Sequence, residues 1–178
     1  MRITEADLKG VHVIETLLSI DERGVLCKTF SECAFHQAGL SPLFKEFLYT
    51  FTRQNTIRGM HFQLPPYEQD KLVFAIKGSV IDVVLDLRKE SDSYGMWYAI
   101  ELSEKNARAL YVPYGFAHGF LSVGEENIVG YLITTVYSED HDAGVRWDSF
   151  GYSWQCDSPI LSNKDRNLQR FEEFDSPF

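Results

Sequence analysis

Alternating apolar and polar positions dominate the middle of the chain and predict β-strands. In KLVFAIKGSVIDVVLDLRK, the residues Leu72, Phe74 and Ile76 occupy every second position. A second alternating set follows the turn around Gly78, made up of Ile81, Val83, Leu85 and Leu87. A period of two on both sides of a glycine is typical of a β-hairpin, in which each set occupies one face of its strand. We therefore predict a hairpin that turns at Gly78.

Further strand-like runs and few helical segments predict an all-β fold. The runs are GMWYAIELS, ARALYVP, HGFLSV and NIVGYLITTVY, separated by Gly, Pro, Ser and Asn. Many short strands at this spacing favour a sandwich or barrel over a parallel α/β sheet. SECAFHQAGLSPLF predicts one short helix that stops near Gly39, and the end NLQRFEEFDSPF is either a terminal helix or an ordered tail. We expect residues 1–178 to form a single domain.

Composition narrows the class of protein. With 178 residues, 44% hydrophobic and 24% charged, the chain has the size and balance of one globular domain. A net charge of -9 argues against a nucleic-acid surface, which needs clustered Lys and Arg. The cysteines Cys27, Cys33 and Cys156 show no paired spacing and indicate reduced thiols. The start lacks the apolar stretch of a signal peptide, and no run has membrane-spanning length, so we expect a cytoplasmic protein without membrane or nucleic-acid partners.

Two histidines beside glycines are the first candidates for chemistry. His61 lies in RGMHFQ and His118 in VPYGFAHGF. Metal-binding cupins carry H-x-H followed later by P-x-G-x-x-H. Here the second motif is present, but the first reads H-F-Q. Because a glutamine amide is a poor replacement for an imidazole, we expect no metal site. A facial triad of the two histidines with Glu68, and ordinary structural roles for both imidazoles, are the alternatives.

Strand parity adds two more expectations. Tyr131 and Tyr137 are six residues apart, so in a continuous strand both phenols point to the same side. If that side lines a barrel mouth, one phenol can donate a proton while the other ring stacks on a base. Arg58 and His61 have opposite parity, so both reach one pocket only if the chain bends or bulges, which Gly59 would allow.

Several ordered motifs together resemble the dTDP-4-dehydrorhamnose 3,5-epimerase family. They are DERG, IRGMHFQ, DKLVFAIKGSVIDVVLDLRKESDSYGMW, ELSEKNARALYVPYGFAHGF, GVRWDSFGYSW and PILSNKDR, and the resemblance runs from about residue 10 to residue 168. The resemblance implies a double-stranded β-helix, that is a cupin or jelly-roll barrel, which works without metal or cofactor and dimerises through N-terminal strands. Such enzymes invert C3 and C5 of a 4-keto-6-deoxyhexose carried on a nucleoside diphosphate.

This reaction defines what the site supplies. A C–H next to a ketone is a weak acid, so the enolate needs a base on one face, a proton donor on the other, and positive charge near O4. By resemblance, His61 is the general base and Asp165 is the acid that orients it. Tyr131 matches the proton donor, and Lys71 matches the cation near the developing oxyanion.

The resemblance also assigns substrate-binding residues. Arg58 matches the arginine that binds the pyrophosphate, and Tyr137 matches the ring that stacks on the base. Arg23 in DERG lies in the nucleotide region. His118, braced by Asp82, matches a second polar group at the sugar.

The chain departs from the family where ligands are selected. After DERG the family reads F-F-x-E, whereas VLCK places Lys28 at the glutamate position. A Q-x-N segment before the arginine appears as Glu46-Phe47-Leu48, and Leu132 replaces the lysine that follows the tyrosine. We therefore expect epimerase chemistry in a homodimer, with dTDP, CDP or GDP as the carrier and C3 alone or both carbons as the target. A metal-dependent enzyme on the same barrel and a non-catalytic sugar-nucleotide binding protein are the competing hypotheses.

Overall fold

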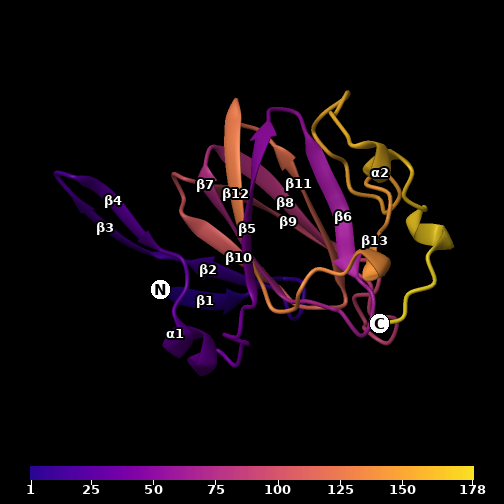
Figure 1. Ribbon diagram of the computed structural model, residues 1–178, viewed down its shortest axis with the longest axis horizontal. Coiled ribbons are helices and arrows are strands. Elements are labelled where there is room, and N and C mark those ends of the chain that lie inside the picture. The colour runs from indigo at the N-terminus through magenta and orange to yellow at the C-terminus, as the bar shows by residue number, and fades with distance from the viewer.

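Two antiparallel sheets face each other across the interior, in a computed structural model that describes residues 1–178 (Figure 1). The six-stranded sheet has the order β1 (Arg2–Glu5), β2 (His12–Glu15), β10 (Arg108–Val112), β7 (Lys71–Lys77), β12 (Glu126–Ile133) and β5 (Glu46–Arg53). The five-stranded sheet has the order β13 (Asp142–Gly144), β6 (Ile57–Gln63), β11 (Phe116–Ser122), β8 (Ser79–Asp86) and β9 (Trp97–Ser103). From β5 onward the chain passes repeatedly from one sheet to the other, which confirms the predicted jelly-roll barrel.

The predicted hairpin at Gly78 is wrong, although both of its strands exist. β7 pairs with β10 and β12, whereas β8 pairs with β9 and β11 in the opposite sheet. Gly78 is the crossing point, with φ at +77° and a neighbouring carbonyl that leaves no room for a Cβ. Alternation located both strands, although Ile76 of the predicted set is 46% exposed. Most of each strand is buried on both faces, so the pattern carried no information about the pairing partner.

Three apolar clusters hold the sheets in place. One lies between them and includes Val73, Val84 and Tyr131. A second covers the outer face of the five-stranded sheet, where the predicted apolar set on β8 packs against the C-terminal segment. The third joins the six-stranded sheet to the helix α1 (Glu32–Gln37) near the N-terminus. The pocket wall on β6 is therefore supported from behind by the C-terminal segment.

The C-terminal segment is an ordered tail rather than a terminal helix. It contains the single turns η1 (Glu139–His141), α2 (Asn163–Arg166) and η2 (Phe171–Glu173), and it runs along the five-stranded sheet (Figure 1). The short helix α1 is confirmed, and Gly39 follows it with φ at +74°. This left-handed conformation suits the end of a helix.

A bulge in β6 solves the parity problem of Arg58 and His61. His118 pairs with His61 and Phe120 pairs with Arg58, so three steps along β6 match two steps along β11. Gly59 has φ at +137°, and a Cβ there would lie 2.5 Å from the Cα of Gly119. The extra residue turns both side chains toward the same cavity, as the sequence predicted.

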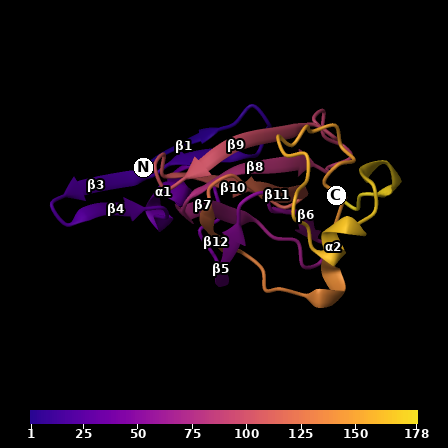
Figure 2. The ribbon, with the colours of Figure 1, turned by 90° about the horizontal axis from the view of Figure 1, so that it is seen from above.

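An N-terminal arm projects from the body of the molecule. It consists of β3 (Leu17–Asp21) and β4 (Gly24–Lys28), which pair only with each other, and every residue of both strands is exposed. Figures 1 and 2 show the arm pointing away from both sheets in two perpendicular views.

Two further findings concern the chain as a whole. No helix is both long and apolar enough to span a membrane. All three cysteines are free thiols.

Candidate active site

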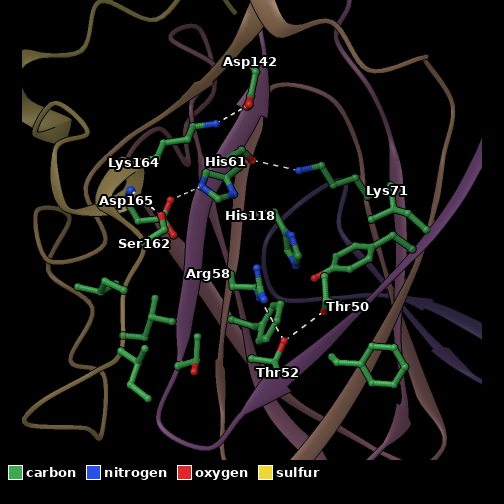
Figure 3. A pocket seen from close by; sticks show the side chains of 18 of the residues that line it. Thr50, Thr52, Arg58, His61, Lys71, His118, Asp142, Ser162, Lys164 and Asp165 are labelled. Atoms are coloured by element: carbon green, nitrogen blue, oxygen red, sulfur yellow. Dashed lines mark hydrogen bonds and ion pairs between the residues drawn. The ribbon is translucent and has the colours of Figure 1, made fainter.

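A cavity of about 700 Å³ opens between the two sheets (Figure 3). Its lining side chains come from two opposed walls. β6 and β11 contribute Arg58, His61 and His118 on one side. β7 and β12 contribute Lys71 and Tyr131 on the other. The residues that the sequence assigned to proton transfer thus meet in one pocket, with an imidazole and a phenol on facing sheets.

The imidazole of His61 is held by a buried carboxylate. Nε2 of His61 lies 2.7 Å from Oδ1 of Asp165, and Asp165 is almost fully buried while His61 is 31% exposed. Burial alone would raise the pKa of Asp165, but hydrogen bonds from His61, the Gly59 amide and the Ser162 hydroxyl outweigh it and lower the pKa. Since the ionised carboxylate accepts the Nε2 proton, Nδ1 of His61 carries the free lone pair and can accept a proton from a ligand.

A second histidine–carboxylate pair lies deeper in the pocket. Nε2 of His118 is 3.0 Å and 2.9 Å from the two oxygens of Asp82, and both residues are buried. The ring of His118 meets the ring of Tyr131 edge to face, with centroids 6.1 Å apart. Burial and the negative charge of Asp82 raise the pKa of Tyr131, so the phenol keeps its proton at neutral pH. A protonated phenol is a proton donor.

Lys71 places a buried cation beside the same space. Its Nζ donates to the backbone oxygen of His61 at 3.1 Å, linking β7 to β6 across the pocket. Burial lowers the pKa of Lys71 to about 8, partly offset by the negative charges of Asp142 and Asp82. At neutral pH the ammonium therefore remains the protonated species, desolvated and able to stabilise an anion strongly.

The remaining lining residues form a polar rim suited to an anionic ligand. Arg53 and Arg58 line the pocket, and Nε of Arg58 donates to Thr52 Oγ1 at 3.1 Å. Lys164 forms an ion pair with Asp142. The Tyr137 hydroxyl donates to Asp142 at 3.0 Å, while its ring stays 59% exposed at the pocket edge. These cations concentrate positive potential in a chain whose net charge is -9.

Four predicted substrate-binding residues do not line this pocket. Asp82 is fully buried behind His118, to which it is hydrogen-bonded. Arg23 and Lys28 lie on the projecting arm, where Arg23 pairs with Asp21. Glu46 lies at the start of β5 and accepts from the Tyr137 amide at 3.4 Å, so it touches the rim from outside. The family's two amides were matched to Glu46 and Leu48, but only Leu48 lines the cavity. Leu132 follows Tyr131 directly in β12, so its side chain points to the opposite face of the sheet. There it packs against the cluster that joins the six-stranded sheet to α1.

The side chains near His61 and His118 do not form a set of ligands that converge on one metal position. Both imidazole Nε2 atoms are occupied by carboxylates, and Glu68 is not among the lining residues. Gln63, at the position of the missing histidine, instead donates to the backbone oxygens of Tyr67 and Val136. No group of three His, Cys, Asp or Glu side chains is arranged to hold an ion.

Sequence reasoning overlooked part of the wall. Thr50 and Thr52 on β5, together with Asp142, Ser162 and Lys164, line the pocket. One signal was available, because Ser162 precedes Asp165 by three residues. This is the spacing of an N-terminal helix cap. Ser162 is the residue before α2, and its Oγ accepts a hydrogen bond from the Asp165 amide at 3.0 Å. The cap fixes the carboxylate that holds His61.

Comparison with known proteins agrees with this geometry. The family model for dTDP-4-dehydrorhamnose 3,5-epimerase matches residues 5–173. A dTDP-4-dehydrorhamnose 3,5-epimerase of Methanothermobacter thermautotrophicus is 40% identical over 177 residues, which cover 97% of this chain and 95% of that protein. The chain belongs to the dTDP-4-dehydrorhamnose 3,5-epimerase family.

Solved structures of the family share the whole fold. The dTDP-4-dehydrorhamnose 3,5-epimerase of Bacillus anthracis, with TDP and PPi bound, superimposes with a TM-score of 0.92 at 36% identity, covering 95% of this chain and 98% of that one. NovW of Streptomyces spheroides, a 4-keto-6-deoxy sugar epimerase, has a TM-score of 0.94 at 30% identity, with coverage of 97% and 88%. The resemblance inferred from the sequence motifs is thereby confirmed, and the protein is an isomerase of this epimerase family.

Proposed function

We propose that this protein inverts C3, C5 or both in a nucleoside-diphosphate 4-keto-6-deoxyhexose, in deoxysugar biosynthesis. The observation that carries the proposal is the placement of a carboxylate-held imidazole and a protonated phenol on opposite sheets of one pocket. Inversion requires removal of a proton from one face of the ring and delivery of another to the opposite face. A base and an acid on facing walls meet that requirement.

The proposed steps follow from the hydrogen bonds. Nδ1 of His61 removes the proton next to the ketone, and Asp165 stabilises the imidazolium that forms. The negative charge moves to O4, where the ammonium of Lys71 and the His118–Asp82 pair stabilise the enolate. Tyr131 then delivers a proton to the opposite face of the carbon. No external cofactor enters these steps, because the electrons stay within the sugar.

The rim supports a diphosphate and a base as further parts of the ligand. Arg53, Arg58 and Lys164 line the pocket as cations, which suits phosphate oxygens. The exposed ring of Tyr137 lies at the rim, where its hydroxyl and Lys164 both contact Asp142, and it offers a stacking surface for a base. The epimerase of Bacillus anthracis holds TDP and PPi, so dTDP is the first carrier to test and CDP and GDP are the alternatives.

We propose that the working form is a cytoplasmic homodimer of single-domain chains. The arm exposes Leu17, Ile20, Val25 and Leu26 to water, with Ile20 74% exposed. Apolar strands without a covering layer favour contact with another chain. Packing of the arm on a partner would also explain why Arg23 and Lys28 do not reach the pocket of their own chain, since they could then approach the pocket of the partner.

Hydrogen exchange into the sugar tests the proposal directly. The protein is incubated in D2O with dTDP-, CDP- and GDP-4-keto-6-deoxyhexoses, and label entry is followed by NMR. Deuterium at C3 and C5 with inversion indicates a double epimerase, and label at C3 alone indicates a 3-epimerase. Tight binding without exchange from any carrier would instead support a non-catalytic binding protein. Elemental analysis showing stoichiometric metal would favour the metal-dependent alternative.

The lowered pKa of Lys71 predicts that the rate of epimerisation falls at alkaline pH. Its pKa of about 8 means that the positive charge is present below this pH and is lost as the pH rises through it. We expect kcat to fall near pH 8 in the native protein. Lys71→Met should lower kcat on the order of 10^2 to 10^3-fold and remove this fall. Lys71→Arg should shift the fall upward, because a guanidinium holds its proton to about pH 12 or above.

The pH profile of kcat provides the measurement, with Lys9→Arg on the surface as the matched control. The control should show the native profile. Retention of the same alkaline fall in Lys71→Met would show that another group is responsible.

A further inference from the structure

Two hydrogen bonds along β5 lead from Arg58 to Thr50, which lies beside Tyr131. Nε of Arg58 donates to Thr52 Oγ1 at 3.1 Å, and Thr52 Oγ1 donates to Thr50 Oγ1 at 3.3 Å (Figure 3). Thr50 is a cross-strand neighbour of Tyr131 and lines the same pocket, and its hydroxyl lowers the pKa of the phenol because it favours the phenolate. Each donor points toward the next oxygen, so the series starts at the guanidinium of Arg58 and leads to the hydroxyl beside the phenol.

Strand register creates this line. In the pairing of β5 with β12, Leu48 lies opposite Tyr131 and Thr50 lies opposite Val129. Thr50 and Tyr131 are thus diagonal neighbours on the inner face of the sheet, within reach of each other. Thr52 follows two residues later on the same face and is only 5% exposed. The hydroxyl groups are therefore directed into the pocket by the backbone and not by chance rotation of surface side chains.

Such a line matters at the moment when Tyr131 gives up its proton. The O–H bond of the phenol breaks, a C–H bond forms on the sugar, and the phenol oxygen becomes an anion. This anion is buried and faces the negative charge of Asp82, both of which disfavour it. A hydroxyl that donates to the anion, and is itself polarised by a neighbour bonded to a guanidinium, offsets that cost.

We propose that Thr50 and Thr52 are positioning residues that transmit hydrogen-bond donation from Arg58 to the Tyr131 phenolate and so set the rate of the inverting protonation. The inference rests on the proposed epimerase function and deepens it. Both threonines keep their own protons throughout. The proton that Tyr131 loses is restored by water entering the open pocket after the product leaves.

Valine and serine variants test the inference in the full-length protein. Thr50→Val keeps the shape of the side chain but removes the hydroxyl. We expect it to lower kcat for inversion roughly 10- to 100-fold, the range for a hydrogen bond to a charged group, with KM nearly unchanged. Thr52→Val should give a smaller loss in the same direction, and Thr50→Ser should restore the native rate. Tyr49→Phe, on the outer face of the same strand, is the matched control and should behave as the native protein.

Exchange in D2O separates this role from a structural one. Proton removal by His61 does not need Thr50, so exchange of the C–H proton should continue in Thr50→Val while inversion slows. A variant that loses exchange and inversion equally would overturn the inference, as would native inversion in Thr50→Val. In a double variant with Tyr131→Phe, the loss should be no greater than in Tyr131→Phe alone, whereas additive losses would count against a shared pathway. Absence of exchange in the native protein would instead refute the proposed function itself.

Discussion

Replacement of His61 by alanine is expected to lower kcat by about 10^2 to 10^4-fold, the contribution of a positioned general base. The imidazole of His61 lines the pocket, is more exposed than that of His118, and leaves Nδ1 free because Nε2 is committed to Asp165 at 2.7 Å. Asp165→Asn should also cripple turnover. An amide carries no charge to stabilise the imidazolium, and it can hold the ring in the wrong tautomer.

Rates of epimerisation by NMR, together with thermal unfolding, measure both effects. His61 is partly exposed and belongs to none of the apolar clusters, so we expect the fold and dTDP binding to survive its removal. His36→Ala, on the exposed surface of α1, is the matched histidine control. Native turnover in both His61→Ala and Asp165→Asn would disprove the assignment of the base.

Tyr131→Phe is expected to reduce inversion to a similar extent, by about 10^2 to 10^4-fold, while sparing proton removal. The ring packs in the cluster between the sheets, and phenylalanine retains that packing. Only the hydroxyl is lost, and with it the proton for the face opposite His61. The enolate can still form and return to the starting sugar, so deuterium should enter without change of configuration.

The ratio of deuterium entry to inverted product reports this outcome. Tyr98→Phe serves as the control, since Tyr98 packs against the same cluster without lining the pocket. If Tyr131→Phe inverts the sugar at the native rate, the proton donor must be another group. If it neither exchanges nor inverts, the tyrosine has a role in the first step.

The four residues proposed for proton transfer could be selected from the sequence because each belongs to a local motif. His61, Lys71, Tyr131 and Asp165 each stand in a distinctive stretch, and the structure brings all four to one pocket or its immediate wall. Parity reasoning also succeeded at Gly59, since a strand with period two needs an extra residue to direct Arg58 and His61 inward.

The two tyrosines show where that reasoning reaches its limit. Tyr131 and Tyr137 both line the pocket as predicted, but β12 ends at Ile133, so they do not belong to one continuous strand. Tyr137 reaches the rim from the following loop and is held there by Asp142. The prediction placed Tyr137 correctly at the pocket, but it assumed a continuous strand, and the strand ends before Tyr137.

The strand β5 was not predicted at all, because its pattern is inverted. Aromatic side chains at Phe47, Tyr49 and Phe51 are exposed, while Thr50 and Thr52 face inward. Alternation normally identifies the apolar face as the buried one. Here the inner face borders a polar cavity. A search for alternating apolar residues therefore does not identify Thr50 and Thr52, whose hydroxyl groups lie beside Arg58 and Tyr131.

By itself, the sequence determined the all-β class, the positions of the regularly alternating strands from β7 to β12, the short helix and the motifs that carry His61, Tyr131 and Lys71. Each depends on residues close together along the chain. Tertiary structure alone decided that β7 and β8 lie in opposite sheets, that Arg23 and Lys28 lie on a projecting arm, and that threonines complete the pocket. These features depend on which distant strands pair and cross, and local periodicity is the same for either choice of partner.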